Sequence, residues 1–436
     1  MSGVISTSPS SSSWWQTTEA AEDTRDYVIS AGLLLYTPDV LPTNISCVLT
    51  PSPFPRLLFH HAMNIQPALN QLIESLSKDS DFIAEAFRKI LKSDDFVRHL
   101  MDIYNEVKAS GDKQTTCLGF HRTDYLVDVQ RSHDGRVSLG LKMVEINTIA
   151  AGFASLSSKM ADLQKYVTSR YTPGSVIEAE PNGCFDGFVD AFATAWKEYG
   201  QSNSVILFVV KENEANKFDQ RQIEHGLWKR YSIRVIRRTL TEIGNTIKLT
   251  PEREAFIDGY EISVVYYRAG YGPSCYHSDI EWNGRRLLEL SKASNCPSAA
   301  YQLIGFKKVQ QILSEKGILE KYIKEEGVVS DVRQTFTGQY TLEQNPEGDK
   351  AVAMALENPQ RFVMKPQREG GGNNLYNEEL KETLSRISSS EERERYILMD
   401  FINAPSFPNF VLKKGEKSIK KMRVISELGI YGAYVR

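Results

Sequence analysis

The chain has 436 residues, of which 41% are apolar and 25% charged, a composition typical of a globular protein with room for two or three domains. Its 52 basic and 55 acidic residues leave a formal net charge of −3, so the charge balance favours neither nucleic acid nor an anionic membrane as a partner. No apolar run reaches the roughly 18–20 residues of a membrane-spanning helix, no secretion signal is recognisable, and the five cysteines are scattered. We therefore expect a cytoplasmic protein.

The first part of the chain is expected to be largely helical. Residues 1–15 are rich in serine and are predicted to form a disordered tail. Between Leu58 and Leu76, apolar residues recur every three or four positions, which places them on one face of a helix. We assign residues 16–202 to a helical region that also contains the first part of the body of the protein.

The pattern changes from helix to strand at Leu139, and side chains alternate along Met143–Asn147. Alternate residues of a strand face the same side, so Glu145 and Asn147 lie roughly 7 Å apart on one face and their oxygens can meet at one cation. A Glu-x-Asn pair is also common at exposed strand edges. A metal site here needs further oxygen ligands, which Glu369 and Glu427 could supply.

Residues 203–305 are expected to form a separate α/β domain. Ser204–Val210 is a nearly continuous apolar run, typical of a strand that is buried on both faces. A helix around Gln220–Lys229 and a strand at Ile233–Ile236 complete a βαβ unit. Ile262–Tyr267 is expected to add a further parallel or mixed strand.

Residues 306–436 alternate again between strand and helix. Phe362–Pro366 and Tyr396–Phe401 are predicted strands, with a glycine-rich loop at Glu369–Asn374 and a helix at Glu378–Ile387 between them.

The end of the chain is predicted to be a β-hairpin. Met422–Glu427 and Ile430–Val435 both have the composition of strands, and Gly429 between them offers the backbone freedom of a tight turn.

The most specific local pattern is the glycine-rich loop. Three consecutive glycines leave backbone N–H groups uncovered, so a phosphate group can approach them. A lysine at the end of the preceding strand can neutralise phosphate charge, and an acidic residue at the start of the loop can hold magnesium. A bare triple glycine is often only a flexible surface loop, but the charged and amide residues around this one favour a phosphate site. The loop with its flanks consists of Lys365, Pro366, Gln367, Arg368, Glu369, Gly370, Gly371, Gly372, Asn373 and Asn374.

Two arginines follow apolar segments. Arg122 and Arg268 could each bind a carboxylate through two parallel hydrogen bonds, although a single arginine after a strand is often only a surface charge.

Together these elements resemble the ATP-grasp arrangement and, within it, the eukaryotic glutathione synthetase family. The resemblance extends from about Pro53 to Arg436 and rests on several motifs that follow one another in the family's order. These motifs are Arg122-Thr123-Asp124-Tyr125, Glu145-Ile146-Asn147-Thr148-Ile149, Phe218-Asp219-Gln220-Arg221, Tyr267-Arg268 with Gly270-Tyr271, Lys307-Lys308-Val309-Gln310-Gln311, the run from Lys365 to Tyr376, Tyr396-Ile397-Leu398-Met399 and Ser426-Glu427-Leu428-Gly429.

The resemblance implies an α/β fold with an ATP-grasp-type core, a helical N-terminal part and an inserted βαβ substrate domain. It implies that ATP drives the ligation of glycine to γ-glutamylcysteine through an acyl phosphate, which gives glutathione, ADP and phosphate. Two Mg²⁺ ions with ATP and a homodimer are expected from the same resemblance. Catalysis of this kind depends on positioning and on cations around the transferring phosphoryl group.

The resemblance also assigns site residues by their positions in the motifs. Magnesium would be held by Glu145, Asn147 and Glu369, and catalytic roles fall to Arg122, Lys307 and Lys365. ATP would be bound by Glu145, Lys307, the loop from Lys365 to Asn374, Tyr376, the adenine-pocket residues Met399, Asp400, Phe401 and Ile402, and Glu427 at the ribose. The dipeptide would be bound by Arg122, Ile149, Ala150, Ala151, Gly152, Glu214, Ala215, Asn216, Gln220, Arg268, Ala269, Gly270 and Tyr271.

The chain departs from the family pattern at three places. Ala150 and Gly152 stand where serines are usual, Phe401 stands where a lysine is common, and the sequence ends at Arg436, where family members continue into a Gly/Ala-rich lid. Two alternatives stay open: a ligase that uses another amine, such as β-alanine, and a non-catalytic relative that binds nucleotide or peptide.

Overall fold

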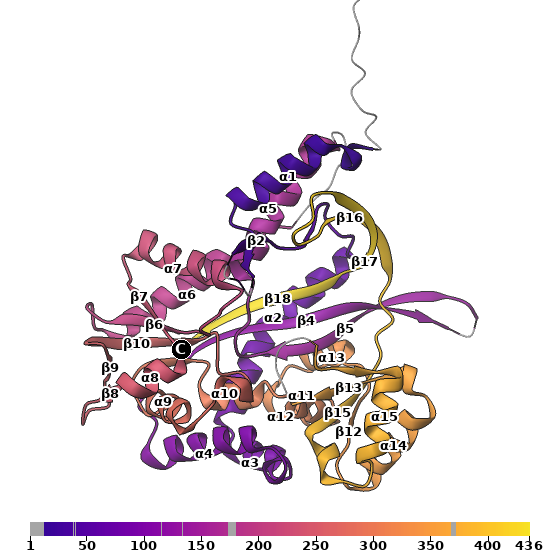
Figure 1. Ribbon diagram of the computed structural model, residues 1–436. Coiled ribbons are helices and arrows are strands. Elements are labelled where there is room, and N and C mark those ends of the chain that lie inside the picture. The colour runs from indigo at the N-terminus through magenta and orange to yellow at the C-terminus, as the bar shows by residue number, and fades with distance from the viewer. Residues whose placement is uncertain are drawn as a thin grey trace, which may run out of the picture.

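The computed structural model describes residues 13–37, 39, 41–114, 116–132, 134–172, 180–367 and 372–436, and it shows a mixed α/β fold (Figure 1). Long antiparallel strands cross the middle of the molecule. An α/β sheet adjoins one end of these strands, and a smaller sheet with its own helices lies below the other end. Among the described residues, no helix is both long enough and apolar enough to cross a membrane.

The central sheet has the strand order β18-β4-β5 and is antiparallel. The predicted amphipathic helix is confirmed as α2, which packs on this sheet with Leu69, Leu72 and Leu76 buried in the shared core. This part contains β4 (Leu118–Arg131), β5 (Val137–Asn147), β18 (Glu427–Val435), α2 (Arg56–Lys78), α3 (Ser80–Phe87), η2 (Ile90–Lys92), α4 (Asp95–Ser110), α10 (Ala299–Ile304), α11 (Lys307–Leu313), α12 (Leu319–Tyr322) and α13 (Glu326–Thr335).

The α/β sheet has the order β7-β6-β10-β9-β8, and β11 also pairs with β10. All five residues of β6 are buried, as its continuous apolar run predicts, and its parallel pairing with β7 across α7 confirms the βαβ unit. The predicted further strand is β10, which is parallel to β6 and β11 and antiparallel to β9. The elements are β6 (Val205–Val209), β7 (Val235–Arg238), β8 (Lys248–Leu249), β9 (Ala255–Ile257), β10 (Tyr260–Tyr267), β11 (Ser294–Cys296), α5 (Ala154–Tyr171), α6 (Cys184–Tyr199), α7 (Lys217–Tyr231), α8 (Leu240–Thr246), α9 (Asp279–Glu289) and η3 (Pro273–Cys275).

A four-stranded antiparallel sheet, β12-β15-β13-β14, packs against two helices through its own small core. The strands expected at Phe362–Pro366 and Tyr396–Phe401 are confirmed as β13 and β15. The elements are β12 (Gln339–Thr341), β13 (Phe362–Pro366), β14 (Leu375–Tyr376), β15 (Tyr396–Asp400), α14 (Pro346–Glu357), α15 (Asn377–Ile387), η4 (Pro359–Arg361) and η5 (Glu391–Arg395).

The N-terminal residues pack on a further three-stranded sheet, β17-β16-β3. Trp14 was expected in a disordered tail, but it is buried and stacks on Tyr171 with ring centroids 5.1 Å apart; residues 1–12 lie outside the described ranges. The elements are η1 (Trp14–Gln16), α1 (Thr18–Ser30), β1 (Leu34–Tyr36), β2 (Pro42–Asn44), β3 (Cys47–Val48), β16 (Ser406–Leu412) and β17 (Ile419–Ile425).

The C-terminal hairpin prediction is wrong. β17 pairs with β16, whereas β18 pairs with β4 in the central sheet, so the two consecutive strands belong to different sheets. Gly429 is not a turn residue but lies within β18, where a Cβ would come within 3.0 Å of Arg122 Cδ and 3.1 Å of Asp124 Oδ1. A larger residue at this position would therefore have to displace the side chains of Arg122 and Asp124 by a few tenths of an ångström.

Candidate active site

Two buried lysines flank the carboxylate of Glu145 near the end of β5. Lys307 begins α11, and its Nζ lies 3.1 Å from Glu145 Oε2. Lys365, on β13, donates a hydrogen bond to the carbonyl of Val144 at 2.8 Å. Burial would raise the pKa of Glu145, but Lys307 and Lys365 lower it overall. Side chains from the central sheet, the helical region and the four-stranded sheet thus bring one carboxylate and two ammonium groups together.

Asp124 joins two of the predicted site residues. Its carboxylate accepts hydrogen bonds from Arg122 Nε at 2.7 Å and Nη2 at 2.8 Å, and from Asn147 Nδ2 at 2.9 Å. Asn147 Nδ2 also donates to the carbonyl of Arg122 at 3.1 Å, so Oδ1 is the end of this amide left for a cation. Asp124 received no role from the sequence, although its position two residues after Arg122 on one strand is a usable signal.

The predicted metal ligands are brought together only in part. Glu145 lies opposite Asp124 on the neighbouring strand. Desolvation by burial, followed by the charges of Asp124 and Glu145, raises the pKa of Glu427. A cation would relieve this crowding of negative charge, and carboxylate and amide oxygens are ligands that Mg²⁺ accepts. Within the described ranges, no three His, Cys, Asp or Glu side chains form a complete metal site, and Glu369 lies outside those ranges.

A cavity of about 700 Å³ lies between the four-stranded sheet and the hairpin of β4 and β5. Its wall includes the predicted nucleotide residues Lys365, Asn374, Tyr376, Met399, Asp400, Phe401 and Ile402, together with Val144 and Val363. The rings of Tyr376 and Phe401 meet edge to face, with centroids 6.5 Å apart. A largely apolar slot beside a lysine suits a purine attached to phosphates.

The phosphate loop is described only at its two ends. Gln367 Oε1 accepts a hydrogen bond from the backbone N–H of Lys308 at 3.0 Å, and Gly372 has a φ of 88°. Pro366 ends β13. The predicted residues Arg368, Glu369, Gly370 and Gly371 lie outside the described part of the chain.

A second group of predicted residues meets at the carboxyl ends of β6 and β10. The backbone N–H groups of Arg268 and Ala269 both donate to the carbonyl of Val209, which fixes the start of the loop after β10. Arg268 is buried; its Nη1 donates to the carbonyl of Ala150 at 3.2 Å, and its Nη2 lies 3.8 Å from Asp219.

The loop from Ala150 to Phe153 connects this group with Arg122. Ala150 and Phe153 have φ values of 53° and 71°. The carbonyl of Gly152 accepts hydrogen bonds from Arg122 Nη1 at 3.3 Å and from the Tyr431 hydroxyl at 2.5 Å. A Cβ at Gly152 would lie 2.6 Å from Arg268 Nη2, so the guanidinium occupies the space that a serine side chain would need here.

Asp219 holds this loop in place. Its carboxylate accepts hydrogen bonds from the backbone N–H groups of Phe153 at 2.9 Å, Ser155 at 3.0 Å and Leu156 at 3.3 Å, which are the first orphan donors of α5. This cap comes from α7 and not from the residue before α5, so no local sequence pattern could have revealed it.

The remaining dipeptide residues surround the same loop. Ile149, Ala151 and Ala269 have buried apolar side chains, so only their backbone groups could form hydrogen bonds with a ligand. Of the predicted dipeptide residues, three carry a buried side-chain atom without a hydrogen-bond partner among the described residues: Asn216 Oδ1, Gln220 Nε2 and Arg268 Nε. Two other predicted members make backbone contacts. Glu214 Oε1 accepts a hydrogen bond from the backbone N–H of Asn216, and the carbonyl of Ala215 accepts one from the backbone N–H of Tyr36 on β1. The last two predicted members, Gly270 and Tyr271, follow β10.

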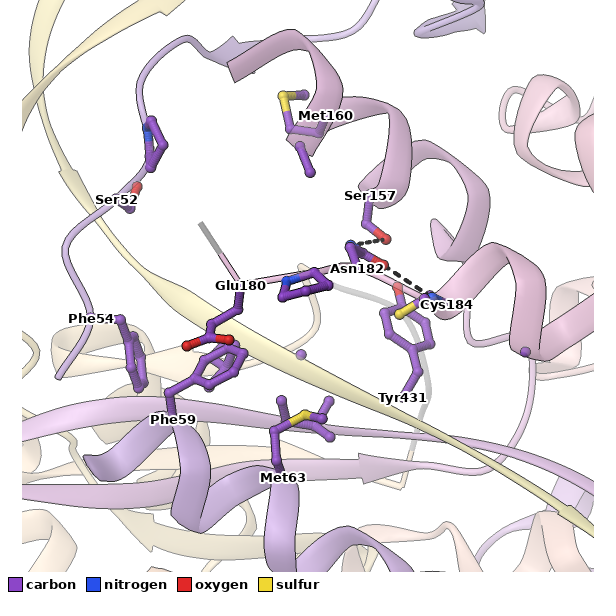
Figure 2. A pocket seen from close by; sticks show the side chains of 18 of the residues that line it. Ser52, Phe54, Phe59, Met63, Ser157, Met160, Glu180, Asn182, Cys184 and Tyr431 are labelled. Carbon is purple, nitrogen blue, oxygen red and sulfur yellow. Dashed lines mark hydrogen bonds between the residues drawn. The ribbon is translucent and has the colours of Figure 1, made fainter. Parts of the chain in front are cut away.

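A larger cavity, of about 1020 Å³, opens on the far side of Tyr431. Figure 2 shows it between the first turns of α2, the helix α5, the start of α6 and the strand β18, with Asn182 hydrogen-bonded to Ser157 and to the N–H of Cys184. None of the predicted site residues that the structure describes lines this cavity.

Comparison with known proteins agrees with this arrangement. The family model described as eukaryotic glutathione synthase, ATP binding domain, matches residues 15–436. Glutathione synthetase from Homo sapiens is 42% identical over 432 residues, covering 97% of this chain and 89% of that protein. Glutathione synthetase from Xenopus laevis is 42% identical over 393 residues, covering 89% of this chain and 81% of that protein.

A solved structure supports the fold alone. The glutathione synthetase-like effector GSS30 from Globodera pallida, in its apo form, superposes with a TM-score of 0.75 at 24% identity, covering 96% of this chain and 89% of that one. From the family model and the two synthetases, the chain belongs to the eukaryotic glutathione synthase family of ATP-dependent ligases.

Proposed function

We propose that the chain ligates glycine to γ-glutamylcysteine at the expense of ATP, with an ATP-grasp-type core, to give glutathione, ADP and phosphate. The observation on which this rests is the position of the two buried lysines. Lys365 lines the nucleotide cavity, Lys307 contacts Glu145, and the strand that contains Glu145 continues into the loop that contacts Arg122 and Arg268. A phosphoryl donor and a carboxylate acceptor would meet at these lysines.

The chemistry requires activation of a carboxylate, which is a poor acyl donor. The γ-phosphoryl group of ATP passes to the cysteinyl carboxylate, ADP leaves, and the amine of glycine attacks the acyl phosphate and displaces phosphate. The two ammonium groups hold the charge of the transferring group, while Arg122 and Arg268 hold the dipeptide in line. Tyr376 and Phe401 enclose the adenine.

Glu145 and Asn147, joined by Glu369, would hold two Mg²⁺ ions. Bound magnesium supplies positive charge against the phosphates of ATP. Three features of the donor set support this. The carboxylate of Glu145 has a lowered pKa and is ionised, and the amide nitrogen of Asn147 is already hydrogen-bonded, so its oxygen is left for a cation. The negative charges near Glu427 repel one another, and a cation would reduce this repulsion.

The test is coupled turnover by the purified chain. With ATP, Mg²⁺, γ-glutamylcysteine and glycine, we expect one ADP per glutathione, measured together by chromatography. Replacing glycine with β-alanine tests the alternative amine in the same assay. ADP release without any tripeptide, or nucleotide binding without turnover, would contradict the proposed ligase.

The proposal includes a homodimer in the cytoplasm. Sedimentation equilibrium should give about twice the chain mass of 49.3 kDa, and a monomer at micromolar concentration would contradict it.

A further inference from the structure

The crevice between β6 and β10 is the point at which the order of the α/β sheet reverses. From β6 the chain crosses outward through α7 to β7 and later returns to β10 on the other side of β6. Ligands bind at such switch points, outside the carboxyl ends of the strands. Two cationic side chains lie close to this crevice: Lys211, just after β6, and Arg237, on β7. No sequence motif assigned either of them to the site.

Lys211 makes a hydrogen bond to a predicted dipeptide residue. Its Nζ lies 2.6 Å from the hydroxyl oxygen of Tyr271 and 4.4 Å from the centroid of that ring. An ammonium group only donates, so the oxygen of Tyr271 is the acceptor and its own proton is left for another partner. Burial would lower the pKa of Lys211, but the bond to Tyr271, with Cys275 and Glu214 nearby, raises it, so the group is a cation at neutral pH.

Arg237 makes the equivalent contact with Gln220. Its Nη2 donates to Gln220 Oε1 at 2.6 Å, and the side chain of Gln220 is fully buried. A guanidinium cannot accept a hydrogen bond, so the amide oxygen of Gln220 must be the atom that faces Arg237. The amide nitrogen, Nε2, therefore points away from Arg237. That Nε2 has no hydrogen-bond partner in the described part of the chain. Burial, and then Arg221, lower the pKa of Arg237 to about 10, which keeps it charged at neutral pH.

Both contacts have the same consequence for a ligand. The oxygens of Tyr271 and Gln220 face cations, so the hydroxyl hydrogen of Tyr271 and the N–H groups of Gln220 are directed away from those cations and can be donated to a ligand. A third donor is Arg268 Nε, which is buried and has no hydrogen-bond partner among the described residues, and Asn216 Oδ1 is a buried acceptor that also has none. Three donors and one acceptor match a carboxylate next to an ammonium group, which is the free amino acid end of a γ-glutamyl dipeptide.

We propose that Lys211 and Arg237 are positioning residues that make this subsite selective for the α-carboxylate of the γ-glutamyl group. They act through Tyr271 and Gln220, by holding the oxygen of each toward a cation and so orienting its donor toward the ligand, and need not touch the dipeptide. The inference rests on the proposed function and adds to it a reason why the subsite should reject analogues without that carboxylate.

The experiment compares two ligands by calorimetry: γ-glutamylcysteine and 4-aminobutanoylcysteine, which lacks only the α-carboxylate. Lys211→Met and Arg237→Met should each weaken binding of the dipeptide about tenfold, because Tyr271 or Gln220 would no longer be held to donate its charge-assisted hydrogen bond to the α-carboxylate. Binding of the analogue should change little. Lys229→Met, at an exposed lysine of α7, and Arg238→Met, at the neighbouring arginine that pairs with Asp258, are the matched controls and should leave both affinities unchanged. ATP affinity should stay constant throughout.

Arg237→Met could fail to fold, so the inference is also tested with Gln220→Glu, a substitution of nearly equal size that leaves no buried cavity. Gln220→Glu keeps a partner for Arg237 but offers only acceptors, so it should weaken the dipeptide more than tenfold and the analogue much less. Equal losses for the two ligands, or wild-type affinities in Lys211→Met and Gln220→Glu, would overturn the inference. Calorimetry needs no turnover, so a wild type that binds the dipeptide selectively but forms no glutathione would contradict the proposed function and leave this inference standing.

Discussion

Removal of the Asp219 carboxylate should open the loop that joins the two halves of the dipeptide site. In Asp219→Ala, three backbone N–H groups at the start of α5 lose their acceptor, and Arg268 loses the carboxylate that lies 3.8 Å from its Nη2. The hydroxyl of Ser155 keeps only the backbone carbonyl of residue 219, at 2.9 Å. Each hydrogen bond to a charged group contributes roughly 1.5–3 kcal/mol, but the donors form one cluster and their losses do not add. We expect a cost of roughly 3–5 kcal/mol, the range for removing one partner of a buried charged pair.

Hydrogen–deuterium exchange resolves this effect locally. Peptides that cover residues 150–160 should exchange roughly 100-fold to 1,000-fold faster in Asp219→Ala than in wild type, since about 1.4 kcal/mol corresponds to a factor of ten. Asp219→Asn retains one acceptor and should lie between the two. Asp186→Ala is the matched control, because Asp186 also lies in the first turn of a helix but is exposed and pairs with Arg230.

Two results would contradict this account of Asp219. One is unchanged exchange at residues 150–160 in the alanine variant. The other is faster exchange spread evenly over the α/β sheet, which would indicate global unfolding in place of a lost helix cap.

Three further predictions concern the site and the core. Glu145→Gln should reduce kcat by roughly 100-fold or more at saturating Mg²⁺, as losses of transition-state charge stabilisation do, and near-normal turnover by a folded variant would exclude the metal role. Gly152→Ala places a Cβ 2.6 Å from Arg268 Nη2, so KM for the dipeptide should rise about tenfold with little change for ATP; Gly140→Ala, with no atom closer than 3.7 Å, is the control. Burial lowers the pKa of His121 to about 3, so this histidine takes up a proton on unfolding below pH ~6.5, and wild type should lose about 2 kcal/mol of stability between pH 8 and pH 5. His121→Gln should lose correspondingly less in urea unfolding over that range, and equal losses in the two proteins would place the titrating group elsewhere.

Much of the secondary structure follows from local patterns in the sequence. The apolar stripe from Leu58 to Leu76 becomes α2, and the continuous run at Ser204–Val210 becomes the fully buried β6. Periodicity of this kind is a local property, because it depends only on which side of an element meets the core. The motifs also sufficed to indicate the family, because several unrelated patterns occur in one order.

The partners of each element depend on contacts between distant residues. β18 pairs with β4, and the hydroxyl of Tyr431 reaches the carbonyl of Gly152 from 279 positions away, so no local pattern could exclude the hairpin that we expected. Asp124 and Asp219 take their roles from neighbours on other elements, which the order of residues does not reveal. Local patterns therefore determine where helices and strands form, whereas burial and hydrogen bonding between distant segments determine which of their polar side chains meet.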